Sequence, residues 1–173
     1  PDSFSELHLC AWRVEVGQPD PENPLIEGDM PWDRGGVGDH GTVFKDPING
    51  KWKAYLECTP AEEYPEKQPE NQGKAWNSEN AAQRRVCLFE SEDGVHWTRP
   101  ELYNVSFGDR QTTNLIFDIN EGTSGYTSVM VDPTNKEFPY EMRVLREHWV
   151  PGWPQAPDGI GYYLYRSKDG RSW

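Results

Sequence analysis

Carboxylates beside the ends of predicted strands are the residues of this sequence best suited to chemistry. A pair of carboxyl groups does general acid–base work, because one group donates a proton while the other activates water or attacks directly. Asp39 stands just before a predicted strand, Asp118 lies on the corresponding approach to a later strand, and Glu147 ends another. Asp39 is the first candidate, since the glycines flanking Asp39 and His40 let the backbone approach a ligand closely.

Polar and aromatic residues near these carboxylates are candidates for holding a ligand. Flat aromatic rings stack on ligand surfaces, and arginine side chains contact polar groups or stack on a ring. Trp149 and Trp153 fall in a predicted loop, where exposed aromatic residues indicate binding more often than packing. The candidate binding residues are Trp32, His40, Glu57, Glu121, Arg143, Arg146, Trp149 and Trp153. Core packing and surface solvation are the alternative interpretations for each of these aromatic and acidic residues.

A motif that occurs twice indicates which elements position these residues. The segment Leu88–Trp97 returns as Leu164–Trp173, and both copies contain an aromatic residue followed by Ser-x-Asp-Gly-x-x-Trp. In each copy an apolar strand is expected to enter a tight turn. There the Gly adopts a positive φ, the Ser and Asp side chains cap backbone N–H groups, and the Trp opens the returning strand.

A second repeated segment supports the same period. Thr42–Pro47 matches Ser128–Pro133, which lies 86 residues further along the chain. Both segments end in Asp-Pro, and Asp46 and Asp132 are interpreted as turn formers. Each is followed by a turn and then by a strand with an aromatic start.

Together these pieces make a repeating unit of four antiparallel strands, which is typical of a β-propeller blade with long loops. Strands are predicted near 6–16, 42–46, 51–58, 85–91, 113–118, 127–132, 140–147 and 161–167, with a further strand from Trp97 and long loops over 17–41 and 59–83. The sequence therefore predicts an all-β chain with two blade units, at about 38–104 and 113–173, after a strand and loop over 1–37. A β-sandwich with two chance turn matches is the alternative.

Two blades leave sheet edges exposed, whereas propellers close with about four to eight blades. We therefore expect the sequence to be a fragment of a longer protein, or a piece that another chain completes. A fragment is the preferred interpretation.

The composition argues against several classes of function. The 29 acidic and 17 basic residues give a net charge of −12, whereas binding to nucleic acid needs a basic surface. No stretch approaches the apolar length of a membrane span. The four histidines pair with no cysteine at ligand spacing, so no metal site is expected. Export cannot be read from a chain that begins at Pro1, although a periplasmic or secreted location is slightly favoured over a cytoplasmic one.

The three cysteines, Cys10, Cys58 and Cys87, form no CxxC pair. Cys58 and Cys87 fall on the second and third predicted strands of one unit, where a bridge between neighbours is possible. Free buried thiols are the preferred interpretation.

On these motifs the sequence resembles the five-bladed β-propeller glycoside hydrolases, the superfamily of invertases, levansucrases and arabinanases, and more narrowly its poorly characterised bacterial members. The resemblance rests on the two Asp-Pro segments with the strands that follow them, on the two Ser-x-Asp-Gly turns, and on residues 113–116. It covers most of residues 38–173. These are motifs of the blade scaffold.

The resemblance implies a cofactor-independent hydrolase that cleaves glycosidic bonds of an oligo- or polysaccharide. One carboxyl group would protonate the leaving oxygen while a second attacks or activates water. These roles would fall to Asp39, Asp118 and Glu147, around the mouth of a central channel. The sequence departs from the family pattern at Gly125, which aligns with Asp39, so the usual pair of acids from neighbouring blades is not visible there.

Two other functions remain open at this point. One is a non-catalytic propeller that binds carbohydrate or protein. The other is a sialidase-like enzyme, but sialidase-type turns carry one more residue between Asp and Gly, and the sequence has no grouping of arginines that would clamp a carboxylate.

Overall fold

The protein is built from two antiparallel β-sheets. The computed structural model describes residues 17–60, 85–116, 123–147 and 161–173, and every regular element in these ranges is a strand. The first sheet contains β1 (Gly36–Lys45), β2 (Trp52–Thr59), β3 (Arg85–Ser91) and β4 (Trp97–Thr98) in chain order. The second contains β5 (Thr123–Val131), β6 (Tyr140–Glu147) and β7 (Gly161–Ser167), also in chain order. The prediction of an all-β chain is confirmed. In the described ranges no helix is long and apolar enough to cross a membrane.

Most predicted strands match the observed ones closely, and β1 is the main exception. The strands predicted at 85–91, 140–147 and 161–167 coincide with β3, β6 and β7. The interpretation of 17–41 as a loop is wrong at its end, because β1 begins at Gly36 and pairs there with Thr59 of β2. The strand predicted over 113–118 is reduced, in its described part, to isolated bridges that include Cys87 with Leu115. The strand predicted over 6–16 lies outside the described residues.

The two Ser-x-Asp-Gly turns have the same hydrogen bonds, as their sequences predict. In the first turn the amide of Gly94 donates to Ser91 Oγ at 2.9 Å, and Asp93 Oδ1 accepts the amides of the next two residues at 2.8 Å each. In the second turn the amide of Gly170 donates to Ser167 Oγ at 2.9 Å. There Asp169 Oδ1 accepts the next two amides at 2.8 and 2.9 Å. Both glycines have positive φ, 87° and 71°.

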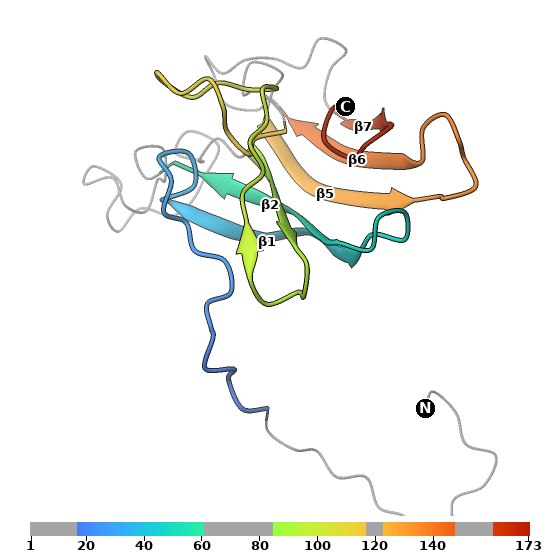
Figure 1. Ribbon diagram of the computed structural model, residues 1–173. Coiled ribbons are helices and arrows are strands. Elements are labelled where there is room, and N and C mark those ends of the chain that lie inside the picture. Colours follow the sequence, from blue (N-terminus) through green and yellow to red (C-terminus); the bar gives the residue numbers. More distant parts are fainter. Residues whose placement is uncertain (1–16, 61–84, 117–122, 148–160) are drawn as a thin grey trace, which may run out of the picture.

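The sheets pack against each other through one apolar core. Its buried members come from both sheets and from the segments that follow β4: Tyr55, Val86, Leu88, Leu102, Ile116, Val129, Met142 and Val144. The first strands of the two sheets are neighbours, since the amide of Val129 in β5 donates to Thr42 Oγ1 in β1 at 3.0 Å. In Figure 1 the second sheet (orange to red) lies against the first, with β5 nearest to it.

A buried polar network also joins the sheets. Lys53 Nζ lies 3.1 Å from Asp46 Oδ2 and donates to the carbonyl of Asp169 at 3.0 Å. Tyr140 of the second sheet donates to Asp46 Oδ2 at 2.7 Å. Tyr55 of the first sheet donates to the carbonyl of Gly170 at 2.6 Å. The Asp169-Gly170 turn therefore both ends β7 of the second sheet and contacts the first sheet.

The hydrogen bonds of this network decide the charge state of Asp46. Burial acts to raise the pKa of its carboxyl group, but hydrogen bonds from Tyr140, the amide of Ile48 and Lys53 outweigh burial and hold the pKa below its ordinary value. Burial raises the pKa of the Tyr55 and Tyr140 hydroxyls, so both remain neutral donors. Asp46 is therefore a buried carboxylate, in addition to being the turn former that its sequence predicts.

A disulfide bond joins Cys58 of β2 to Cys87 of β3, so the prediction of free thiols is wrong. The register explains the bond. Cys58 is opposite Arg85 and Cys87 is opposite Leu56, which makes the two cysteines diagonal neighbours on one face of the sheet. Their Cα atoms are 6.2 Å apart, a separation that a disulfide spans.

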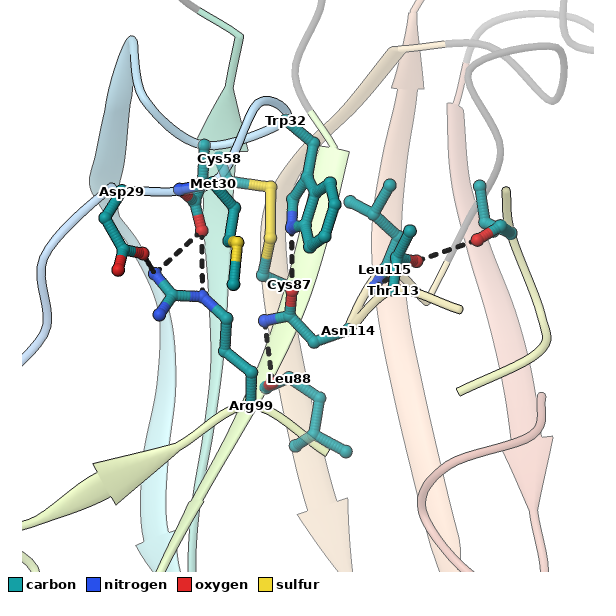
Figure 2. The surroundings of a disulfide bond; sticks show 12 residues. Asp29, Met30, Trp32, Cys58, Cys87, Leu88, Arg99, Thr113, Asn114 and Leu115 are labelled. Atoms are coloured by element: carbon teal, nitrogen blue, oxygen red, sulfur yellow. Dashed lines mark hydrogen bonds and ion pairs between the residues drawn. A yellow bond between two sulfur atoms is a disulfide. The ribbon is translucent and has the colours of Figure 1, made fainter. Parts of the chain in front are cut away.

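Side chains from outside the strands cover this face of the first sheet. Trp32 is 2% exposed, and its Nε1 donates to Asn114 Oδ1 at 2.7 Å. Asn114 Nδ2 donates in turn to the carbonyl of Leu88 at 2.9 Å. Figure 2 shows Trp32 and Asn114 beside the disulfide.

Candidate functional site

The bulged ends of β1 and β5 are the candidate functional site, because Asp39, His40 and Glu57 lie at the β1 bulge and β5 is the neighbouring strand. In β1, three residues lie between the paired positions Val37 and Gly41, namely Gly38, Asp39 and His40. On β2 only one residue, Glu57, lies between the corresponding partners. The register of β5 also shifts, between Gly125 and Ser128. Extra residues of this kind re-aim side chains and are common next to active sites. Because β1 and β5 are neighbours, the two bulges lie in the first strands of adjoining sheets.

His40 and Glu57 meet at the β1 bulge. His40 Nδ1 lies 3.5 Å from Glu57 Oε2. The Glu57 side chain is only 4% exposed, whereas that of His40 is 37% exposed. A buried carboxylate beside a partly exposed imidazole can orient that ring or exchange a proton through it. Sequence analysis named both residues as ligand-binding candidates, and the fold brings them together.

Thr127 is a buried polar residue in the β5 bulge that sequence analysis did not identify. Its side chain is buried, and Oγ1 has no hydrogen-bond partner among the described residues. Buried hydroxyl groups are normally hydrogen-bonded, so this oxygen is suited to a water or a ligand. The sequence around Thr127 does not predict its burial, because the burial depends on the packing of β5 against the first sheet.

Gly41 has a structural role beside the candidate site. A Cβ atom at this position would collide with the Tyr55 carbonyl and would lie 2.9 Å from Leu56 Cδ2. At Gly38 a Cβ would lie 3.3 Å from the Cβ of Glu57. The glycines around Asp39 therefore let β1 lie close to β2, which is a different use from the close approach to a ligand that the sequence suggested.

The second sheet contributes predicted residues at β6. Arg143 is exposed, and its Nη1 lies 3.8 Å from Met130 Sδ on the face of the sheet turned away from the first sheet. Arg146 and Glu147 end β6 opposite Ser124 and Thr123. The backbones of these two residues are described, but their side chains are not. The same holds for Asp39 in β1.

The remaining predicted residues lie elsewhere. Trp32 packs on the disulfide face of the first sheet, whereas strand alternation directs Glu57 to the opposite face. Because Trp32 is buried, its side chain has a packing role. Four predicted residues lie outside the described ranges: Asp118, Glu121, Trp149 and Trp153.

Three further buried acids are each paired with a cation. Asp33 lies 3.0 Å from Arg99, Asp46 lies 3.1 Å from Lys53, and Glu90 lies 2.6 Å from Arg171. Burial raises the pKa of Asp33, although the Met30 amide and Arg99 partly oppose this rise. The Asp33–Arg99 pair joins the segment before β1 to the segment after β4, and the Glu90–Arg171 pair joins the first sheet to the turn after β7. The Asp46–Lys53 pair joins the end of β1 to β2. Glu57 differs from them in facing an imidazole. In the described ranges no group of three or more His, Cys, Asp or Glu side chains could hold a metal ion.

Comparisons with known proteins identify no family for the chain. No protein-family model matches it, and no curated protein matches it. Among solved structures, an N-acetylgalactosamine deacetylase from F. plautii, in complex with blood group B trisaccharide, is similar over 77% of this chain, with 17% sequence identity and a TM-score of 0.40. The chain spans 28% of the length of that enzyme chain. At this level the similarity establishes neither a common fold nor a common activity.

Proposed function

We propose that the two sheets are blades of a five-bladed β-propeller glycoside hydrolase, which cleaves glycosidic bonds of a glycan with paired carboxyl groups. The repeated unit supports this proposal, since each sheet is a meander that begins with a bulged strand and whose third strand ends in the same Ser-x-Asp-Gly turn. In a propeller the first strand of each blade lines the central axis. The neighbouring positions of β1 and β5 fit that arrangement.

The observation that carries the proposal is the convergence of the two bulges. The β1 bulge contains Asp39 and His40 opposite Glu57, the β5 bulge contains Thr127, and the two strands are neighbours at Thr42 and Val129, which supports a common site. The sequence resemblance adds carboxylate roles. Asp39 and Glu147 are proposed as catalytic carboxyl groups, with Asp118 as a third, while the His40–Glu57 pair orients substrate hydroxyl groups.

The test is turnover of aryl glycosides and polysaccharides by the protein, together with any further sheets that its gene encodes. Asp39→Asn is expected to lower kcat about 100-fold or more, because it removes one partner of the carboxyl pair. Glu57→Gln is expected mainly to raise KM, since its proposed role is to position the substrate. Asp109→Asn, at an exposed residue of a loop, is the matched control and should keep full activity.

Two outcomes would count against the proposal. Undiminished turnover in Asp39→Asn would remove Asp39 from the catalytic pair. Binding of a glycan without turnover of any substrate would instead assign a non-catalytic carbohydrate-binding propeller. Circular dichroism and thermal melting of each variant separate these outcomes from a loss of folding.

A further inference from the structure

The disulfide bond lies directly behind Glu57, on the opposite face of the first sheet. In the register of β2 and β3, Glu57 is paired with Val86. Cys58 is the next residue after Glu57 on β2, and Cys87 is the next residue after Val86 on β3. The bond between the cysteines therefore crosses the Glu57–Val86 pair diagonally and ties the two strands together at that point. Figure 2 shows the bond between these strands.

The other neighbour of Glu57 is the bulge of β1, where the ladder between β1 and β2 is irregular. Three residues of β1, at 38–40, lie opposite Glu57 alone. A bulge of this kind disrupts the ladder locally and bends the strand that contains it. The regular pairing at Glu57 is the pairing with β3. The position of the Glu57 backbone therefore depends on how firmly β2 is held to β3.

The start of β3 is well anchored, but it is also the end of a ladder. Val86 is completely buried, and its carbonyl accepts the amide of Ile116 at 2.8 Å. However, β3 begins at Arg85, only one residue before Val86. The ends of a ladder open more readily than its middle. A covalent bond across the Glu57–Val86 pair closes this end and joins β2 to the anchored strand.

The second sheet has neither the carboxylate nor the cross-link at the equivalent positions. The registers of β2 with β3 and of β6 with β7 align the two sheets through their Ser-x-Asp-Gly turns. Leu145 stands in the place of Glu57, and Arg146 and Tyr163 stand in the places of the two cysteines. The repeated unit therefore forms its sheet without a disulfide here. The cross-link occurs in the sheet that carries the buried carboxylate, which favours a role at Glu57 over a general role in holding each unit together.

We propose that the Cys58–Cys87 disulfide positions Glu57 and holds its carboxylate against the imidazole of His40. His40 Nδ1 lies 3.5 Å from Glu57 Oε2, and the strength of such a contact depends steeply on distance and angle. A small shift of β2 would change both. Cys58 and Cys87 are thus positioning residues, which act through Glu57. Both are buried, so the cross-link is a fixed part of the folded site.

Nuclear magnetic resonance of the His40 ring tests the proposal. The protein, with any further sheets that its gene encodes, is isotope-labelled in its histidine rings, and His40→Gln identifies the His40 signal. A carboxylate beside an imidazole changes the charge and hydrogen bonding of the ring, so Glu57→Gln should displace this signal. The double variant Cys58→Ala and Cys87→Ala should displace it in the same direction, by about half as much or more. The signal of His96, in the turn at the other end of β3, should stay in place.

Phe89→Leu is the matched control for a general loss of stability. Phe89 lies on the same face of β3 as Cys87 and packs in the same buried cluster, but it is paired with Ala54, away from Glu57. This variant should lower the melting temperature and leave the His40 signal in place. A His40 signal that moves as far in Phe89→Leu as in the double variant would show that any loosening of the sheet has this effect, and it would overturn the proposal.

Two further results would overturn the positioning role. One is an unmoved His40 signal in a folded protein without the disulfide. The other is an unmoved signal in Glu57→Gln, because the two side chains would then not meet in solution. If the double alanine variant does not fold, Cys58→Ala with Cys87→Val takes its place, since it restores part of the buried volume. Circular dichroism confirms that each variant is folded.

The consequence for catalysis rests on the proposed function. If the His40–Glu57 pair orients substrate hydroxyl groups, loss of the disulfide should raise KM several-fold with a smaller change in kcat, as expected for Glu57→Gln. The His40 measurement needs no turnover. A protein that cleaves no glycoside would therefore count against the proposed function, whereas the His40 signal alone decides whether the disulfide positions Glu57.

Discussion

Lys53 and Asp46 show how this fold uses charge at the scale of single residues. Both side chains are at most 1% exposed, so each has lost its hydration. Removing two charges from water is costly, and their attraction offsets that cost only where further hydrogen bonds satisfy the remaining donors and acceptors of both groups. Tyr140 and the Ile48 amide donate hydrogen bonds to Asp46, and Lys53 donates one to the carbonyl of Asp169. The pair thereby fixes how the second sheet sits on the first.

Asp46→Asn is expected to lower the free energy of unfolding at neutral pH by about 3–5 kcal/mol, because it leaves Lys53 buried without its anion. The pKa of Asp46 is lowered in the folded state from an ordinary value of 3.8, so its contribution is complete above pH 3.8 and is lost as the pH falls through the lower, folded-state pKa. Urea denaturation of both proteins should therefore give curves that converge in acid. Asp109→Asn should stay close to the unmodified protein at neutral pH, and a deficit in Asp46→Asn that is constant with pH would contradict the ion-pair account.

The sequence predicts the structural roles of some single residues but not of others. The cap residues Asp93 and Asp169 could be predicted, since their partners lie within three residues in the chain. The burial of Lys53 could not, because its partners come from distant segments that only the packing of two sheets brings together. The same reason applies to the contact between His40 and Glu57, which depends on the bulge in β1.

The Ser-x-Asp-Gly turn is the element that links local sequence to packing. Its first copy, Ser91 to Trp97, closes on itself, since Trp97 Nε1 donates to the carbonyl of Gly94 at 3.0 Å. In the second copy the corresponding carbonyl, of Gly170, accepts from Tyr55 of the other sheet instead. The same Ser and Asp hydrogen bonds therefore accompany a local contact of the glycine carbonyl in the first copy and a tertiary contact in the second.

Alanine substitutions at Gly170 of this turn and at Gly50 of the β1–β2 turn separate the backbone cost of a positive φ from the tertiary contribution at Gly170. Gly50→Ala should cost about 1–2 kcal/mol, because its φ is +77° and nothing lies within 4 Å of the new Cβ. Gly170→Ala has a similar backbone cost, with a φ of +71°, but its Cβ would lie 2.7 Å from the Tyr55 hydroxyl and 2.9 Å from Lys53 Nζ. We expect an additional loss of about 1–3 kcal/mol from this overpacking. Chemical denaturation measures both variants, and equal losses would show that the contact between the sheets contributes nothing at Gly170.

The strands were predictable where a run of apolar and aromatic residues leads into a turn signal, as in β3 and β7. The first part of β1 lacks that pattern, because three of its first six residues are glycines (Gly36, Gly38 and Gly41) and its pairing with β2 is interrupted between Val37 and Gly41. The disulfide was missed for a related reason. Whether Cys58 and Cys87 are bonded depends on a register that their distance in the sequence does not reveal.

For the whole molecule, the core between the sheets couples their stabilities. Met142 and Val129 of the second sheet pack with Tyr55 and Leu88 of the first in one buried cluster. The period of the sequence repeats predicted two similar units. It did not predict which faces would meet, since the contacts between the units involve side chains that differ between the repeats, such as Tyr55 and Arg143.

Met142→Ala should therefore destabilise both sheets together, by about 2–5 kcal/mol, because it opens a cavity in their common core. Met130→Ala is the control, since Met130 is 54% exposed and its truncation should change stability by only about 0.5 kcal/mol. Far-ultraviolet circular dichroism and tryptophan fluorescence should report one coincident transition for Met142→Ala. Two separate transitions would show that the sheets unfold independently.

The bond between Cys58 and Cys87 has a consequence for how the protein is made. Both sulfur-bearing residues are at most 1% exposed, so reductants in the medium have little access to them once the strands have closed. In a compartment where glutathione keeps thiols reduced, the chain would be made without this disulfide bond. Such a protein would lack the cross-link between β2 and β3. Expression in an oxidising compartment, with a thiol assay of the purified product, is the sound starting point for laboratory work.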